Sequence, residues 1–410
     1  MSTAKLSTLS SKPLVRIIIL GMAVTSMLAF GVFGIGRDGG FGQGPYDMGF
    51  DMKILYIGGL TWLKGLNAYD PQIASQVSGG LVSAQRYDFA YPPQIAPFVL
   101  LLGLFPFAKA RALMVLLNLF SILAVAFFCV RFVQRGSIKE LDDTSSAPKW
   151  FIPAIIIGNP FTAHILWMGQ TSIIATAAWV GGWYFAERKR WLLSGILIGF
   201  STFKPQVTLL ILIWLLLERR LRLLGVAALS ILVFSLYPML ITGPIAVFKY
   251  WFGSLKIYTS LVHNSLGFQN IFGLQNALHS LGINLPNLLP VGVILVGILW
   301  WQRQQFLHDD IIGILPAIAL LMGFSHDYDL VVLAPLVAVV WRHLHHNDKQ
   351  SLVGIIVMAS MFFPQRFLRP LKIDFLLHYR VFILVGALIW LLVLSYRKSI
   401  ELRTEVSLST

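Results

Sequence analysis

Apolar runs of a dozen or more residues recur along the whole chain, and they constrain its fold more than any other feature. Of the 410 residues, 57% are hydrophobic and only 12% are charged. A soluble domain carries about 25% charged residues, roughly twice that share. Because about 20 consecutive apolar residues can cross a bilayer as a helix, the sequence predicts an all-α polytopic membrane protein.

The apolar runs predict a bundle of about twelve transmembrane helices. They cover about residues 15–36, 111–131, 151–168, 170–187, 191–203, 206–218, 222–242, 286–302, 311–325, 329–342, 352–364 and 378–396. Several runs are short for bare lipid, so we expect them to pack inside the bundle or beside a water-filled cavity. The basic N-terminus and its apolar run lack a convincing cleavage site, which predicts a retained first span. Residues 1–410 are therefore expected to form one membrane domain.

Short basic clusters between the runs indicate the orientation of the chain. There are 32 Lys and Arg against 18 Asp and Glu, which gives a net charge of +14. Because the basic residues gather in short loops, they are read as orientation signals rather than as a nucleic-acid surface. If the segment 91–105 lies in the membrane plane instead of crossing, the basic clusters fall together in the cytoplasm. This reading predicts a first external loop, 37–110, with in-plane helices.

The opening of that loop contains the first candidate catalytic residue. Its sequence, from Met48 to Pro71, is MGFDMKILYIGGLTWLKGLNAYDP. Asp51 could serve as a general base on the membrane surface, and the alternative is an N-cap of the helix that follows. The turn sequence GLNAYDP ends this helix, and its Asp70 has a structural interpretation.

Lys204 is the most informative single residue of the later loops. It lies in GFSTFKPQ, between two apolar runs of only about a dozen residues each, and a lysine facing lipid at that depth would cost at least a few kcal/mol. Pro205 breaks the helix there and can direct the side chain to a cavity. A cation in such a place suits a phosphate or carboxylate group, and the alternative is a lysine that extends to the interface.

A second polar tip has the sequence SHDYD and contains His326, Asp327 and Asp329. A histidine and an aspartate could form an acid–base pair or bind a divalent metal. Because adjacent side chains do not share a helix face, one of them could instead cap the following helix. No second set of ligands with metal-site spacing accompanies them, so we expect no metal.

Other residues complete the candidate site with weaker signals. Gln170, in MGQTS, is read as a helix entry unless it reaches the same cavity. The YPP sequence at Tyr91 predicts an extended entry into the in-plane helix. This entry would place Tyr87, Asp88 and Tyr91 near the mouth of the substrate cavity. Arg366 and Arg369 are further candidates for binding a phosphate, because an arginine fork fits phosphate oxygens. The lone Cys129 lies in an apolar run and excludes a disulfide within the chain.

Taken in order, these motifs resemble glycosyltransferase family 87. The resemblance rests on GFDMKILYIGGLTWLKGLNAYDP, FAYPP, NPFTAHILWMGQTS, GILIGFSTFKPQ and SHDYDLVVLAP, over about residues 10–345. These are membrane enzymes of the GT-C class, similar to polyprenol-phosphate-mannose-dependent α-mannosyltransferases. The resemblance implies a GT-C-like bundle and an inverting, metal-independent transfer without a cofactor. It also implies a hexose, most commonly mannose, that moves from a polyprenyl-phosphate donor to a lipid or glycan acceptor.

The resemblance also implies roles for individual residues. Asp51 matches the first-loop carboxylate that acts as general base, and Lys204 matches a lysine near the donor phosphate. His326 matches a polar residue that lines the cavity, and we expect it to bind the donor phosphate together with Lys204, Arg366 and Arg369. Where the family usually has an aromatic pair after the aspartate, only Tyr56 stands here. The substrate cavity is expected to include Tyr56, Tyr91, Gln170, Asp327 and Asp329.

The expected location is the plasma (inner) membrane, with the active site on the external or periplasmic side. The expected partners are the donor lipid, the acceptor and membrane lipids, and no nucleic acid. A different class, a transporter or flippase for lipid-linked glycans, remains as an alternative; it would need polar residues at mid-bilayer. A glycan polymerase or ligase would share the external chemistry, but such proteins generally have a large loop late in the chain.

Overall fold

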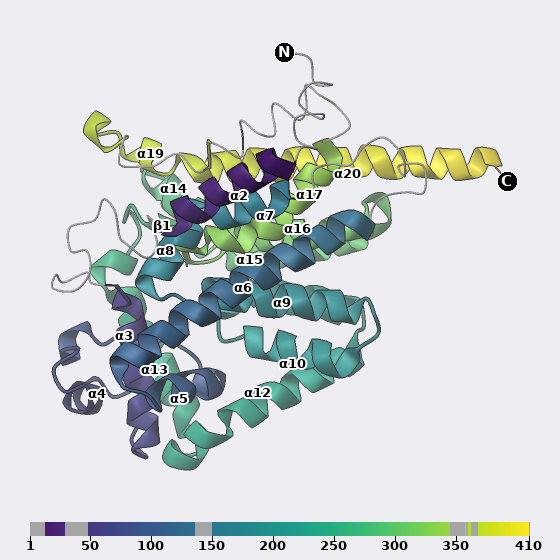
Figure 1. Cartoon of the computed structure of the whole chain (residues 1–410). Coiled ribbons are helices and arrows are strands. Elements are labelled where there is room, and N and C mark those ends of the chain that lie inside the picture. The colour runs from purple at the N-terminus through teal and green to yellow at the C-terminus, as the bar shows by residue number, and fades with distance from the viewer. Residues whose placement is uncertain are drawn as a thin grey trace.

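The computed structural model describes residues 13–28, 48–135, 150–344, 357, 360–361 and 368–409. The predicted spans that lie in these residues coincide with helices (Figure 1). The bundle consists of α2 (Pro13–Met27), α6 (Phe107–Arg135), α7 (Phe151–Gly158), α8 (Pro160–Met168), α9 (Ser172–Ala186), α10 (Trp191–Ser201), α11 (Pro205–Leu217), α12 (Leu221–Thr242), α15 (Leu289–Trp301), α16 (Ile311–Met322), α17 (Ala334–Leu344) and α20 (Tyr379–Ser409). The predicted span 352–364 lies largely outside the described residues.

Shorter helices and 3₁₀ turns occupy the connections. The helices are α3 (Phe50–Leu63), α4 (Pro71–Val77), α5 (Ala96–Gly103), α13 (Ala246–Ser260), α14 (Leu274–His279) and α19 (Asp374–Leu377). The turns are η2 (Ala84–Arg86), η3 (Pro93–Ile95), η5 (Val262–Asn264), η6 (Arg303–Gln305), η7 (His308–Asp310), η8 (Asp327–Leu333) and η10 (Arg369–Leu371). The predicted span 329–342 is therefore wrong in its first turns, which form η8 rather than α-helix.

The count of twelve spans is not confirmed. In the described part of the chain, three helical stretches are long and apolar enough to cross a membrane: Phe107–Val133, Leu221–Thr242 and Tyr379–Glu401. The pair α7 and α8 passes together as one span that is bent by 47°. Most other bundle helices have 11 to 15 residues, and at 1.5 Å per residue they rise about 16–22 Å, less than the ~30 Å hydrocarbon core.

Small residues allow the bundle helices to approach closely. Helix α10 packs between α9 and α12. A Cβ atom on Gly195 would lie 2.5 Å from the Cβ of Val226, and one on Gly199 would lie 2.7 Å from the carbonyl oxygen of Ala227. Membrane helices use small residues in this way, because lipid supplies no hydrophobic force between helices. Larger side chains on α10 would push α12 away.

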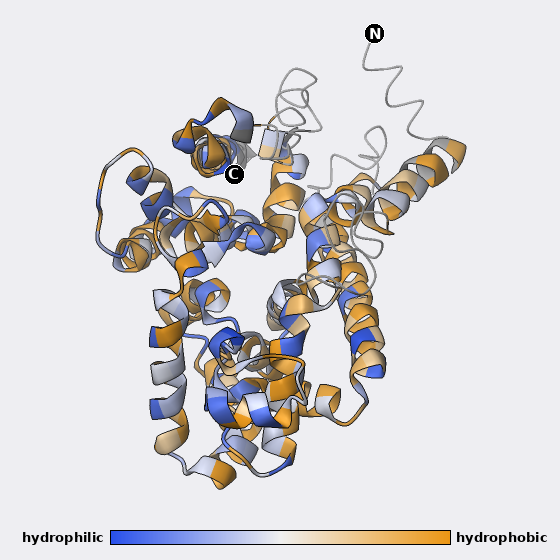
Figure 2. Ribbon diagram, turned by 90° about the vertical axis from the view of Figure 1, so that its left-hand side faces the viewer, coloured by the Kyte–Doolittle hydropathy of each residue, from blue (hydrophilic) through white to orange (hydrophobic). Residues whose placement is uncertain are grey.

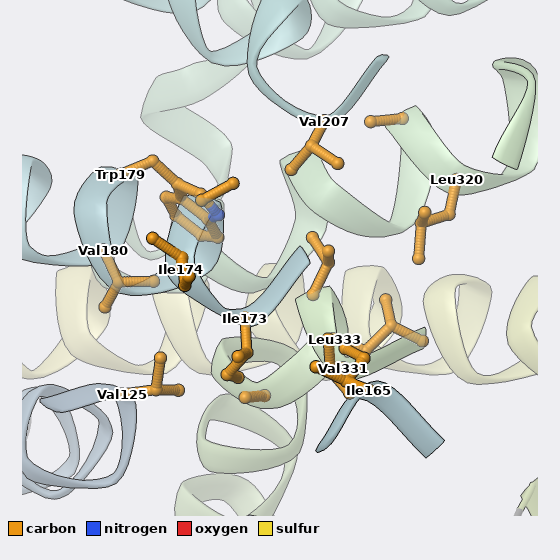
Figure 3. Close-up of a cluster of buried hydrophobic side chains, with 14 of the residues drawn as sticks. Val125, Ile165, Ile173, Ile174, Trp179, Val180, Val207, Leu320, Val331 and Leu333 are labelled. Carbon is orange, nitrogen blue, oxygen red and sulfur yellow. The ribbon is translucent and has the colours of Figure 1, made fainter. Parts of the chain in front are cut away.

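The core lies where α6, α8, α9, α11, α16 and η8 meet. Figure 3 shows Val125, Ile165, Trp179, Val207 and Leu320 converging from five helices, and all five side chains are buried. The outer faces of α6 and α12 instead expose large apolar side chains, and hydrophobic stretches of helix run through all parts of the molecule (Figure 2). An apolar core together with apolar outer faces is what a bundle in lipid requires.

Helices α3, α4, α5 and α13 gather at one end of the bundle, at the lower left of Figure 1. Helix α5 lies against α3 so closely that a Cβ on Gly59 would lie 1.9 Å from the carbonyl oxygen of Val99. Its 8 residues rise only about 12 Å. This length agrees with the expectation that the segment 91–105 does not cross the membrane.

A two-residue ladder departs from the all-α prediction. Strand β1 (Ile271–Phe272) pairs antiparallel with β2 (Ser325–His326), with Ile271 opposite His326. The amide of Asp327 also donates to the carbonyl of Asn270 at 3.0 Å. The ladder fixes the SHDYD segment to the loop that follows α13. Strands of two residues carry no periodicity, so the sequence does not reveal them.

The basic turns lie together at the other end of the bundle. Arg220, before α12, and Arg303, after α15, both approach Glu218, at 3.8 and 3.6 Å. Arg342, at the end of α17, pairs with Asp309 at 3.1 Å and also with Asp310. These ion pairs gather basic residues from three turns at one end of the bundle.

Candidate active site

Asp51 lies in the first turn of α3 and is not its N-cap. The cap is Gly49, whose φ of 85° is in the left-handed region, and whose amide donates to the carbonyl of Trp167 at 2.7 Å. A glycine adopts this conformation without steric cost. The capping interpretation of Asp51 is therefore wrong. Its carboxylate is directed instead to the turn between α8 and α9.

That turn brings Gln170 to Asp51. Helix α8 ends at Gly169, with a φ of 70°, and a Cβ at this position would lie 2.6 Å from the Cβ of Met52. The close approach lets the side-chain amide of Gln170 donate to a carboxylate oxygen of Asp51. On its other side, Gln170 accepts from the hydroxyl of Tyr91 at 3.4 Å. Gln170 thus belongs to the site and is more than a helix entry.

Lys204 is buried and paired. Its ammonium donates to the hydroxyl of Ser172 at 2.6 Å and to Asp329 at 2.9 Å, and the side chains of Lys204 and Asp329 are only 4% and 1% exposed. Ser172 also donates to the same carboxylate oxygen at 2.5 Å. These two bonds use two of the three N–H donors of an ammonium group. A charge so deep in the protein is stable because it is paired and hydrogen-bonded.

The SHDYD segment both caps a helix and builds the site. Asp329 accepts from the amide of His326 at 3.1 Å, as in a capping box. The ring Nε2 of His326 lies 3.0 Å from the hydroxyl of Tyr258, on α13. Burial lowers the pKa of His326 to about 4. The imidazole is therefore neutral at neutral pH, and it offers a hydrogen bond rather than a charge.

Aromatic rings line the space between Lys204 and His326. The Tyr328 ring centroid lies 5.2 Å from Nζ of Lys204, within the range of a cation–π contact. The rings of Tyr328 and His326 stack, with their centroids 5.1 Å apart. Tyr328 and Tyr258 are side chains that the sequence interpretation missed. An aromatic residue in an apolar sequence gives no signal that distinguishes a site from a core.

Asp327 has a different partner from its neighbours. It pairs with Arg380, at the start of α20, at 3.0 Å, and the guanidinium of Arg380 lies over the ring of Phe161. Arg380 also donates to the carbonyl of Met361 at 3.0 Å. The ion pair ties the SHDYD segment to the last long helix. This makes Asp327 an anchor of the segment.

A second carboxyl group lies near Asp51. Burial, together with the charge of Asp51, raises the pKa of Asp88 to about 7. Asp88 precedes the segment Phe89–Tyr91, which α13 holds through two hydrogen bonds, from Ser254 to Phe89 (2.6 Å) and from Trp251 to Ala90 (3.0 Å). The sequence placed Asp88 near the mouth of the site without a role.

The remaining predicted residues lie apart from this group. Tyr56 donates to the carbonyl of Phe105 at 3.1 Å and packs against the ring of Phe107, so the structure does not bring it to Asp51. Arg366 lies outside the described residues, and the side chain of Arg369 does too.

Three side chains with metal-ligating atoms cluster elsewhere in the described residues. The side chains of Glu187, His308 and Asp309 place one potential ligand atom each within 4.8 Å of one another. They belong to the end that carries the basic turns, where Asp309 also pairs with Arg342. This group is therefore not part of the candidate active site.

Together these contacts make one polar site. It has a carboxylate oriented by an amide, a buried cation in an ion pair, a neutral imidazole and aromatic walls. Such a site can take a proton from a hydroxyl group and stabilise an anionic leaving group. Its side chains come from the starts or ends of α3, α9, α11 and α13 and from β2–η8.

Comparison with known proteins places the chain in a family. No curated protein matches it. The sequence profile of glycosyltransferase family 87 matches residues 89–368, which contain Lys204, His326 and Asp329. The match begins later than the resemblance predicted, and α3 with Asp51 lies before it. Since the match covers more than half of the 410 residues, the chain belongs to glycosyltransferase family 87.

Proposed function

We propose that this membrane glycosyltransferase moves a hexose, mannose in the first instance, from a polyprenyl-phosphate donor to a lipid or glycan acceptor. The reaction takes place at the external face of the plasma (inner) membrane, inverts the anomeric carbon and needs no metal. Family membership makes the chain an enzyme, so the transporter alternative is set aside. The observation that carries the proposal is that one turn holds both groups: Gln170 bonds to the carboxylate of Asp51, and Ser172, two residues later, accepts from the buried ammonium of Lys204.

In this mechanism Asp51 is the general base. It takes the proton of an acceptor hydroxyl while the oxygen attacks the anomeric carbon of the donor. The new bond forms between that oxygen and the carbon, and the bond from the carbon to the phosphate oxygen breaks. Polyprenyl phosphate leaves as a stable anion, so no general acid is required. Gln170 orients the carboxylate and holds it in place between turnovers.

Lys204 stabilises the charge that develops on the leaving phosphate. Its hydrogen bonds to Asp329 and Ser172 fix the position of the ammonium. They use two of its three N–H donors, and the third can donate to a phosphate oxygen. A preorganised cation in a water-poor site has a stronger effect than one in water. His326 contributes a neutral hydrogen bond, and Arg366 and Arg369 remain candidate phosphate partners from the loop before α20.

The test is transfer by purified protein from a polyprenyl phosphate that carries a radiolabelled hexose. We expect Asp51→Asn to abolish transfer and to leave donor binding intact. The matched control is Asp70→Asn, because Asp70 caps α4 in the same loop by accepting from Gln72 and Ile73 at 2.8 and 3.2 Å, and asparagine caps equally well. Full transfer by Asp51→Asn would overturn the assignment. Mass analysis of the lipids and glycans lost on gene deletion would identify the acceptor.

A further inference from the structure

Asp88 is a charged group of the site that the proposed mechanism does not use. Its side chain is 22% exposed, and its carboxylate lies 4.0 Å from Nε2 of His263, in η5, which is 56% exposed. Lys204 and Asp329, at the inner end of the site, are almost fully buried. Exposure therefore increases from the buried ion pair towards Asp88 and His263. These two residues mark the side from which a soluble part of a substrate can enter.

The carboxylate of Asp88 accepts a hydrogen bond from its own backbone amide, which leaves further acceptor positions for a ligand. Among the described residues, no side chain donates a hydrogen bond to its carboxylate. The titratable groups around it are Asp51 on α3, His263 on η5, Tyr258 on α13 and the neighbouring Tyr87 and Tyr91. Asp51 repels a charge on Asp88, and burial makes His263 harder to protonate by lowering its pKa.

Two carboxyl groups close enough to repel each other, as Asp51 and Asp88 are, favour a ligand with several donors. Each carboxylate accepts hydrogen bonds but donates none when it is ionised. Asp51 already accepts from Gln170, and a carboxylate can accept several hydrogen bonds, so a hydroxyl group bound to each carboxylate would reduce the cost of holding two like charges together. A ligand with a single hydroxyl could satisfy only one of them.

We propose that Asp88 binds the acceptor by accepting a hydrogen bond from one hydroxyl group while Asp51 takes the proton of another. The acceptor is then a molecule with two neighbouring hydroxyl groups, as in a sugar or polyol head group. This inference rests on the proposed function, because it assigns the acceptor side of the same site. His263, at the outer edge, closes the far side of the acceptor subsite.

The proposal predicts how acceptor binding depends on pH. Ionised Asp88 accepts a hydrogen bond, and the pKa of Asp88 is about 7. The apparent acceptor KM of the wild type should therefore fall as the pH rises from about 6 to about 8, whereas the donor KM should not follow this change. In Asp88→Asn the acceptor KM should be about tenfold higher at pH 8 and independent of pH. Asp88→Glu should keep the pH dependence.

The assay uses full-length protein, a radiolabelled hexosyl polyprenyl phosphate, and membranes of a deletion strain as the titrated source of acceptor. An acceptor KM that is the same at both pH values in the wild type, or unchanged in Asp88→Asn, overturns this proposal while the proposed function stands. Absence of transfer by the wild type overturns both.

A folding control accompanies this assay. Because the pKa of Asp88 is raised in the folded protein, its ionisation destabilises the fold as the pH rises above the unfolded value and through about 7. Asp88→Asn should therefore melt at a higher temperature than the wild type at pH 8 and at the same temperature in acid below both pKa values. If Asp88→Asn fails to fold, the pH dependence of the wild type and of Asp88→Glu decides the question.

Discussion

At the residue scale, Lys204 has two roles: it stabilises the fold by pairing with Asp329, and we propose that it binds the donor phosphate. The sequence indicates a cation beside a phosphate, and the structure shows that the cation already has a partner, Asp329, which in turn caps η8 through His326. An unpaired carboxylate at that depth would be costly, so the lysine is needed for the fold before any substrate binds. The fixed ion pair is also what would hold the ammonium at one position for the donor phosphate.

A double-mutant cycle separates the role of Lys204 in stability from its role in donor binding. Lys204→Met should destabilise the protein by about 3–5 kcal/mol, because it leaves a buried charge on Asp329 unpaired. The double variant Lys204→Met with Asp329→Asn should regain most of that stability, because neither charge remains. Both variants should bind the donor lipid more weakly than the wild type. Thermal unfolding and donor-binding measurements check these expectations, and an unchanged donor affinity in the double variant would remove Lys204 from the phosphate site.

At the element scale, the turn between α8 and α9 assembles the catalytic pair. Asp51 and Gln170 are 119 positions apart in the chain, and they meet because the glycine at the end of α8 lets this turn touch the start of α3. The helix cap at Gly49 belongs to the same contact, since its amide bonds to the last turn of α8. The close approach of the backbone at Gly169 to the start of α3 therefore sets the distance between Asp51 and Gln170.

Gly169→Ala tests this contact. The added Cβ would meet Met52 at 2.6 Å, and the backbone is left-handed with a φ of 70°, which costs about 1–2 kcal/mol for a residue with a side chain. We expect transfer to fall at least tenfold, because α3 must shift and Gln170 then loses Asp51. Gly65→Ala is the matched control: its φ is also 70°, but an added Cβ would have nothing within 4 Å.

The control should lose similar stability and keep the wild-type transfer rate. Equal transfer rates in the two variants, measured with the same labelled donor, would mean that the close approach does not position the pair.

At the scale of the whole molecule, the chain has two polar ends that differ in chemistry. One end carries Asp51, Lys204, His326 and Asp88, and the other carries the basic turns with Arg220, Arg303 and Arg342. Lipid-facing apolar surface covers the helices between these ends. In the orientation that we propose, the basic end faces the cytoplasm, as the positive-inside rule favours, and the active site lies outside.

Cysteine accessibility tests this orientation. Cys129 is buried in α6, and Cys129→Ala provides a background without thiols, since it is the single cysteine of the chain. In that background Thr259→Cys, exposed on α13, should react with an impermeant maleimide in intact cells. Arg190→Cys, exposed in the turn before α10, should react only after permeabilisation. Reaction of both from the same side would refute the orientation.

The fold class, the family and the polar motifs of this protein can be predicted from the sequence, because apolar runs and helix-breaking tips are local signals. Lys204, His326 and the turn at Gln170 stand out in this way. The number of true spans cannot be predicted, because helices of 11 to 15 residues are apolar whether they cross lipid or pack inside the bundle. The small ladder at His326 and the cap at Gly49 escaped prediction because neither has a periodic pattern.

The sequence by itself determined that the chain forms apolar helices with polar residues at their tips, since both properties depend on neighbouring residues alone. Only the tertiary structure decided which polar residues act together. Asp329 completes the pair with Lys204 from 125 positions away, and Asp88 takes its raised pKa from burial and from the charge of Asp51. Burial and pairing depend on long-range packing, so the chemical state of each tip residue is a property of the folded molecule.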